Sequence, residues 1–306
     1  MSSCRWRSLC CGWLVIGWLV AACNALDAQD RESTASAALP IDLHRLAEWL
    51  RRSPAEETTA AGTADRNTLP GGVLQAALAA EGIEAAQANL YARRIDAWVD
   101  ELDGLSDDPL ARATAALALL HRRVLKHYDA RASSVAGALD EGRYNCLGSV
   151  ILFAALAERL DLPCQAVERP GHVLMRLKVE GHSIDLETTT AQGVDLPQTP
   201  ADAVSAERVL SHRALLALVY FNRGCDLLER RAFRAALVAN LRALEFDPDN
   251  ARARNNLLAA WNNWALALAR QGERRAATEL LTLGLEWAPA YRLFADNLQA
   301  IGTLAP

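Results

Sequence analysis

Apolar residues recur at helical spacing between residues 146 and 160. The positions involved are Val150, Ile151, Phe153, Ala154, Leu156, Ala157 and Leu160. Asp161 and Pro163 end the run, so the pattern predicts a helix that begins at Cys146. In the first turn of a helix, unpaired backbone N–H groups and the helix dipole favour an anion, which at Cys146 would be a thiolate.

After Pro170-Gly171 the spacing changes to the alternation of a β-strand. Residues 172–179 place Val173, Met175, Leu177 and Val179 on one side and His172, Leu174, Arg176 and Lys178 on the other. Glu180-Gly181 indicates a tight turn, and residues 183–189 alternate in the same way. The pattern therefore predicts an antiparallel hairpin with a two-residue turn.

This hairpin has a predicted register. It places three pairs on one face: Arg176 with Asp185, Leu174 with Glu187, and His172 with Thr189. Glu187 is then diagonal to His172 and within its reach, while Asp185 forms a cross-strand ion pair with Arg176. One extra residue in the turn would reverse the second strand and exchange the two acids, so Asp185 is the alternative partner of His172.

Helical spacing also marks the region before Cys146. Residues 41–52 predict a short amphipathic helix, residues 53–69 a polar loop, and residues 71–102 one or two helices. Asp107-Asp108-Pro109 is typical of a helix start, with Asp108 as the cap and Pro109 in the first turn.

From Ala206 onward the chain is predicted to be helical and repetitive. Two sets of residues match motif positions of a tetratricopeptide repeat: Tyr220, Gly224, Ala236, Ala243 and Pro248, then Trp261, Ala265, Ala277 and Pro289. The two prolines are further apart than one repeat of about 34 residues. The second repeat is therefore expected to carry about two extra turns in its first helix, and residues 291–304 to form a cap.

A thiol, a histidine and a carboxylate in this order have a chemical meaning. The thiolate is the nucleophile, the imidazole accepts and returns a proton, and the acid fixes the orientation of the imidazole. The candidate catalytic residues are therefore Cys146, His172 and Glu187, with Asp185 as the alternative third member.

The same motifs carry a resemblance to a known family. Cys146 at a helix start, Pro170-Gly171-His172 on a strand, Glu187 two residues before Thr189, and the phrase LAERLDLP between them resemble the transglutaminase-like core of the papain-like cysteine fold. More narrowly, the chain is similar to bacterial proteins that place this core ahead of tetratricopeptide repeats. The resemblance covers roughly residue 107 to the C-terminus.

This resemblance implies an α+β fold. A helical N-terminal region would precede a core in which one helix packs on a small antiparallel sheet, and all-α repeats would follow. The wider family usually has an Asp-Pro-Thr run where this chain has Glu187-Thr188-Thr189. Some members of such bacterial groups lack the cysteine and keep only the scaffold, whereas this chain has Cys146.

The first 22 residues are typical of a secretory signal. Arg5 and Arg7 precede an apolar run that ends at Ala22 and is too short for a stable membrane span. Val20-Ala21-Ala22-Cys23 looks like a bacterial lipobox, which would make Cys23 the lipidated first residue of the mature protein. An ordinary signal, cleaved after Ala22 or Ala25, is the alternative. Residues 24–40 are predicted to be a tether.

Composition narrows the possible functions. The net charge is −5, and no basic stripe is interleaved with aromatic residues, which argues against a nucleic-acid partner. Outside the signal and Cys23, the remaining cysteines are Cys146, Cys164 and Cys225. A helix of about 1.5 Å rise per residue would hold Cys146 about 20 Å from Cys164, so a disulfide, if any forms, joins Cys164 to Cys225.

No cofactor or metal site is predicted. His121 and His127 have no metal-like partner at suitable spacing and are expected to be surface or packing residues.

Together these features predict a lipid-anchored protein of the bacterial cell envelope that faces the periplasm. Residues 41–204 would form the transglutaminase-like domain with its helical N-terminal part, and residues 205–306 the repeat domain. The expected activity is cysteine-dependent amide hydrolysis or acyl transfer on a protein or peptide. The repeats would offer a groove for a protein or peptide, or only pack as a buttress. The alternative function is a non-catalytic envelope scaffold with a relic core.

Overall fold

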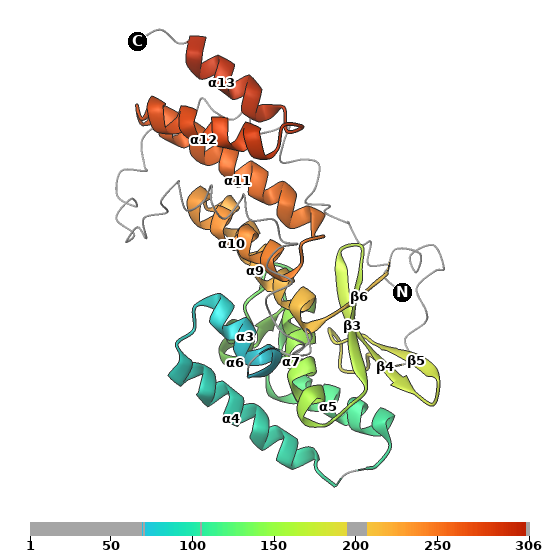
Figure 1. Cartoon of the computed structure of the whole chain (residues 1–306). Coiled ribbons are helices and arrows are strands. Elements are labelled where there is room, and N and C mark those ends of the chain that lie inside the picture. The colour runs from blue at the N-terminus through green and yellow to red at the C-terminus, as the bar shows by residue number, and fades with distance from the viewer. Residues whose placement is uncertain (1–68, 70, 105, 195–206, 304–306) are drawn as a thin grey trace, which may run out of the picture. The chain divides into compact units, whose positions relative to one another are not determined.

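The computed structural model describes residues 69, 71–104, 106–194 and 207–303, all of which belong to the unit Leu50–Pro306. Within these ranges the chain is α+β, with many helices and a small antiparallel sheet (Figure 1), so the predicted class is confirmed in this general form. The predicted signal, Cys23, the tether and the helix at residues 41–52 lie outside the described residues, as does nearly all of the loop at 53–69.

The N-terminal part of the described chain contains three helices, α3 (Gly72–Glu81), α4 (Ala85–Leu102) and α5 (Pro109–Arg123). The predicted region 71–102 thus forms two helices, because Gly82 ends α3 in a left-handed conformation. The predicted start of α5 is confirmed. The Asp108 side chain accepts hydrogen bonds from the N–H groups of Leu110 and Ala111, and Pro109 lies in the first turn.

Two further helices lead to the sheet, α6 (Val135–Glu141) and α7 (Cys146–Arg159). Helix α7 begins at Cys146, as predicted, and the side chain of Asn145 caps it by accepting a hydrogen bond of 3.0 Å from the N–H of Gly148. Every residue from 147 to 157 is buried, since this helix is apolar on all sides and lies in the core.

The antiparallel sheet has the strand order β5-β4-β3-β6. The strands are β3 (Cys164–Arg169), β4 (His172–Val179), β5 (His182–Leu186) and β6 (Arg208–Leu210). Helix α7 packs against β3 and β4, and Val173, Met175 and Leu177 of β4 belong to the same apolar core as α7.

The β4–β5 hairpin has the predicted register, with Arg176 opposite Asp185. Glu180 and Gly181 both have positive φ (49° and 81°), the conformation of a two-residue turn that matches strand twist. The strand pairing stops at Leu186, however, so the predicted pairs of Leu174 with Glu187 and of His172 with Thr189 do not form within β5.

Glu187 leaves the ladder because its backbone turns toward Gly193. The Glu187 N–H donates to the carbonyl oxygen of Gly193 at 2.8 Å. A Cβ atom at Gly193 would lie 1.8 Å from the Glu187 carbonyl oxygen, so this close approach requires glycine.

The described residues from 207 to 303 contain five helices, orange to red in Figure 1, each packed on the next along the chain. They are α9 (His212–Glu229), α10 (Phe233–Phe246), α11 (Ala251–Arg270), α12 (Arg274–Trp287) and α13 (Leu293–Thr303). The second predicted repeat is expected to begin with a long helix. Helix α11, which lies at this position, has 20 residues, but α9 is almost as long with 18. Within the described ranges, no helix is long and apolar enough to cross a membrane.

The small residues at the predicted motif positions lie where these helices meet. Ala236, Ala243, Ala265 and Ala277 are fully buried. At Gly224, a Cβ atom would lie 2.4 Å from the Asn240 side chain, so glycine allows α9 and α10 to approach closely.

The helical series also packs against the rest of the structure. Helix α9 contacts α3 and α7. Arg208 of β6 forms ion pairs with Glu168 of β3 at 2.9 Å and with Asp247 at the end of α10 at 2.7 Å. These contacts join the sheet to the C-terminal helices.

Candidate active site

Cys146 is the first residue of α7 and is half-buried. Its carbonyl oxygen accepts a hydrogen bond of 3.0 Å from the hydroxyl of Ser149, whose oxygen also lies 2.8 Å from Oγ1 of Thr188. Ser149 and Thr188 are both fully buried. The first turn of α7 is therefore tied to the loop that follows β5 and contains Glu187.

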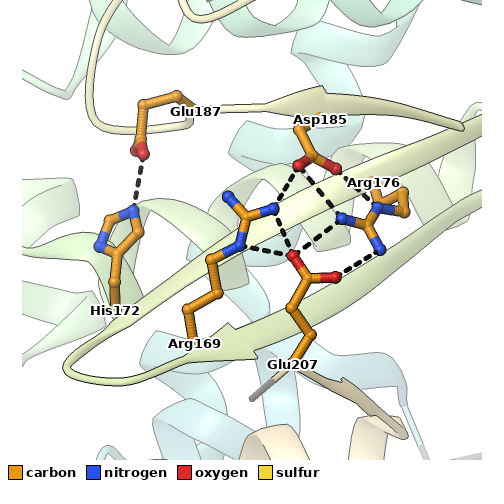
Figure 2. Close-up of polar contacts among 6 residues, drawn as sticks. All are labelled: Arg169, His172, Arg176, Asp185, Glu187 and Glu207. Atoms are coloured by element: carbon orange, nitrogen blue, oxygen red, sulfur yellow. Dashed lines mark hydrogen bonds and ion pairs between the residues drawn. The ribbon is translucent and has the colours of Figure 1, made fainter. Parts of the chain in front are cut away.

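His172, the first residue of β4, contacts Glu187 in this loop. Its Nε2 atom lies 2.6 Å from Oε2 of Glu187 (Figure 2). The other carboxylate oxygen, Oε1, accepts hydrogen bonds from the N–H of Thr189 at 3.0 Å and from its hydroxyl at 2.6 Å. Both oxygens of Glu187 are thus held, and the contact predicted between Glu187 and His172 is present.

The side chain of Cys146 also lies close enough to the imidazole of His172 to affect its pKa. Burial opposes the positive charge of the imidazole, but interactions with the side chains of Cys146 and Glu187, and the charges of both, raise the pKa of His172 to about 10. For Glu187, burial likewise opposes ionisation, yet the hydrogen bond and charge of His172 and the Thr189 donors hold its pKa below the ordinary value. At neutral pH the site therefore contains an imidazolium between a sulfur and a carboxylate.

Asp185, the alternative third member, has other partners. Its Oδ1 atom lies 2.6 Å from Nε of Arg176, and its Oδ2 atom lies 2.6 Å from Nη2 of Arg169. Burial opposes the negative charge, but these two guanidinium groups lower the pKa of Asp185. The structure therefore brings Cys146, His172 and Glu187 together and assigns Asp185 to a separate cluster.

That cluster contains a fourth residue, Glu207, which directly precedes β6 (Figure 2). Its carboxylate forms ion pairs with Arg176, at 3.0 Å, and with Arg169. The four side chains are only 12% to 25% exposed. The simple Arg176–Asp185 pair of the prediction is thus half of a largely buried network of two acids and two arginines.

Three rings form an aromatic row that includes Tyr144, two residues before Cys146. His121 contacts the ring of Tyr144 edge-on at 5.9 Å, and Tyr144 contacts the ring of Tyr128 in the same way at 5.8 Å. Tyr144 donates its hydroxyl to the carbonyl oxygen of Thr189 at 2.9 Å. Nε2 of His121 lies 3.1 Å from the carbonyl oxygen of Thr188, which can only accept, so this nitrogen carries the proton.

His121 is therefore a packing residue, as predicted, and it also supports the loop that contains Glu187. Burial is the main cause that lowers its pKa, which keeps its ring neutral at neutral pH. The sequence pattern did not reveal that His121 and Tyr144 hold this loop.

The disulfide considered between Cys164 and Cys225 does not form, because all three described cysteines are free. Cys164 packs against the apolar core, and burial raises the pKa of its thiol to about 12. Cys225 of α9 accepts a hydrogen bond from Nδ2 of Asn256 in α11 at 3.1 Å. Among the described residues, no three or more His, Cys, Asp or Glu side chains are grouped so that they could hold a metal ion.

Comparison with protein-family models, with curated proteins and with solved structures finds no match to this chain. The geometry of Cys146, His172 and Glu187 is therefore what marks this region as a candidate functional site.

Proposed function

We propose that this protein is a cysteine-dependent enzyme with a transglutaminase-like core that hydrolyses or transfers the acyl group of an amide in a protein or peptide. The observation that carries the proposal is the position of His172, which contacts Glu187 at 2.6 Å and lies close enough to Cys146, at the start of α7, for the thiol to affect its pKa. A purely structural histidine has no need of a thiol on one side and a fixed carboxylate on the other.

The arrangement supports a two-step reaction. The Cys146 thiolate attacks the carbonyl carbon of the amide, and the His172 imidazolium gives its proton to the leaving amine, so that a thioester forms as the C–N bond breaks. In the second step, water or a second amine attacks the thioester while His172 accepts its proton, and the thiolate leaves. Glu187 holds the imidazole in place during both steps.

The second candidate function is a non-catalytic scaffold of the cell envelope, in which the core is a relic. The close packing of α9 on α3 and α7 supports this function, because such packing is expected if the C-terminal helices serve as a buttress. In the favoured proposal these helices are tetratricopeptide repeats that recruit or present a protein. A scaffold has no use for a reactive thiol, so the behaviour of Cys146 separates the two functions.

Iodoacetamide at about pH 6 is expected to label Cys146 in the folded protein and to leave Cys164 and Cys225 unmodified. An ordinary thiol has a pKa of about 8.5 and is mostly protonated at this pH. Cys164 is a control within the same chain, because burial raises its pKa to about 12. Mass spectrometry of tryptic peptides over time measures all three rates.

The matched variant for this experiment is His172→Gln, which removes the imidazolium and is expected to slow labelling of Cys146 by at least about 10-fold. Equal and slow labelling of all three cysteines, unaffected by His172→Gln, would favour the scaffold.

We also propose that Cys23 carries the lipid that anchors the protein at the envelope, facing the periplasm. The support is the run Val20-Ala21-Ala22-Cys23 after the apolar segment. Radiolabelled palmitate is expected to be incorporated into the wild type and into Cys11→Ser, but not into Cys23→Ser. A wild type that remains unlabelled and soluble would contradict the lipid anchor.

A further inference from the structure

Tyr128 is placed near the start of α7 by a short pair of parallel strands. Strand β1 (His127–Tyr128) pairs with β2 (Arg143–Tyr144), and Tyr128 lies directly opposite Tyr144. Paired strands are about 4.8 Å apart. Because Cys146 follows Tyr144 by two residues, this pairing brings the backbone of Tyr128 close to the start of α7.

The ring of Tyr128 is held in place on one side and open to solvent on the other. Tyr128 as a residue is 48% exposed, whereas Tyr144, whose ring it contacts, is only 4% exposed. The two rings meet edge-on, at an interplanar angle of 81°. The Asp129 N–H donates to the Tyr144 carbonyl oxygen at 2.9 Å, which fixes the backbone on the C-terminal side of Tyr128.

The electrostatic surroundings agree with this placement. Burial, followed by the negative charges of Cys146 and Glu187, raises the pKa of Tyr128, so its phenol lies within electrostatic reach of both catalytic groups and stays neutral. The neighbouring charges of Arg143 and Asp129 are paired with each other at 2.5 Å. An exposed, uncharged aromatic ring thus lies within electrostatic reach of the thiol.

We propose that Tyr128 forms one wall of the subsite that receives the substrate side chain next to the scissile amide, and that this subsite favours aromatic and large apolar side chains. The inference rests on the proposed function and adds a substrate class to it. An exposed ring near the nucleophile binds such side chains through apolar burial and ring contacts, for which acidic or very small side chains offer no counterpart.

Two reagents of different size test this subsite. We would measure the second-order rates at which iodoacetamide and N-benzyl-iodoacetamide alkylate Cys146. The rate of the benzyl reagent divided by that of iodoacetamide is then divided by the same ratio for N-acetylcysteine. The wild type is expected to favour the benzyl reagent by about 2- to 10-fold on this scale. Tyr128→Phe is expected to keep the preference and Tyr128→Leu to bring it to about 1.

Leu90→Ala is the matched control, because Leu90 is an exposed apolar residue of α4, at 51%, outside the site, and its loss is expected to leave the preference unchanged. Circular dichroism and melting temperature check that each variant is folded. If Tyr128→Leu fails to fold, Tyr128→Trp replaces it. Its larger ring is expected to raise the preference, and an unchanged preference would overturn the proposal.

The possible failures are distinguishable. No benzyl preference in the wild type, or the same preference in Tyr128→Leu, overturns the subsite but leaves the function standing as long as labelling of Cys146 depends on His172. Loss of the preference in Tyr128→Phe also overturns it, since the hydroxyl rather than the ring would then be the binding group. Labelling that does not depend on His172 overturns the proposed function, and the subsite with it.

Discussion

Glu187→Gln is expected to slow the reaction of Cys146 with iodoacetamide at about pH 6 by about 10²- to 10⁴-fold, with the fold intact. Glu187 is the carboxylate that contacts His172, at 2.6 Å, and its charge helps to keep the imidazole protonated. Glutamine keeps the size of the side chain and an oxygen that can accept from Thr189, so the loop is retained. The labelling rate and the melting temperature are measured together.

Asp185→Asn is the matched control, because it removes the charge of the other candidate acid, two residues earlier in the chain. Asp185 is bound to Arg169 and Arg176 rather than to His172. The labelling rate is expected to stay within about 2-fold of the wild type, while the free energy of unfolding falls by about 1–3 kcal/mol because two largely buried guanidinium groups lose a charged partner. If Asp185→Asn silences the thiol and Glu187→Gln does not, the roles of the two acids must be exchanged.

The hairpin shows how far the pattern of residues predicts this site. A two-residue turn at Glu180-Gly181 determines which residues face each other, so the contact of Arg176 with Asp185 follows from local sequence. The contact of Glu187 with His172 was also predicted, but it forms from the loop after Leu186 and not from a cross-strand pair. The start of α7 at Cys146 was also predictable, because Asn145 is a good cap and the apolar run begins directly after it.

The rest of the site depends on contacts between distant segments. Glu207 reaches Arg169 and Arg176 only because β6 pairs with β3, and three residues of strand carry too little periodicity to be recognised. Strands β1 and β2 have two residues each, so the placement of Tyr128 beside Tyr144 is likewise a tertiary result. Arg169 could have been found, because the turn at Pro170-Gly171 predicts that it faces His172.

The raised pKa of His172 has a consequence for stability. A base whose pKa is higher in the folded state stabilises that state fully below its ordinary pKa of about 6.5, and this contribution is lost as the pH rises toward the folded-state pKa of about 10. As the pH rises between these values, the free energy of unfolding of the wild type should therefore fall relative to that of His172→Gln. This difference follows from the same charge that determines how the thiol reacts.

The ratio of the iodoacetate rate to the iodoacetamide rate at Cys146 is expected to fall as the pH rises through about 10. The His172 imidazolium attracts the anionic reagent but not the neutral one, and it loses its proton near this pH. The fall is expected to be about 5-fold or more, measured by mass spectrometry between about pH 6 and pH 11.

Two variants determine which residue causes this fall. His172→Gln has no proton to lose, so its ratio should be low and should show no step at pH 10. Glu187→Gln removes one of the groups that raise the pKa of His172, so its step should move to lower pH. A wild-type step near pH 6.5, the ordinary histidine value, would mean that Cys146 and Glu187 do not stabilise the imidazolium, and the proposed catalytic arrangement would be wrong.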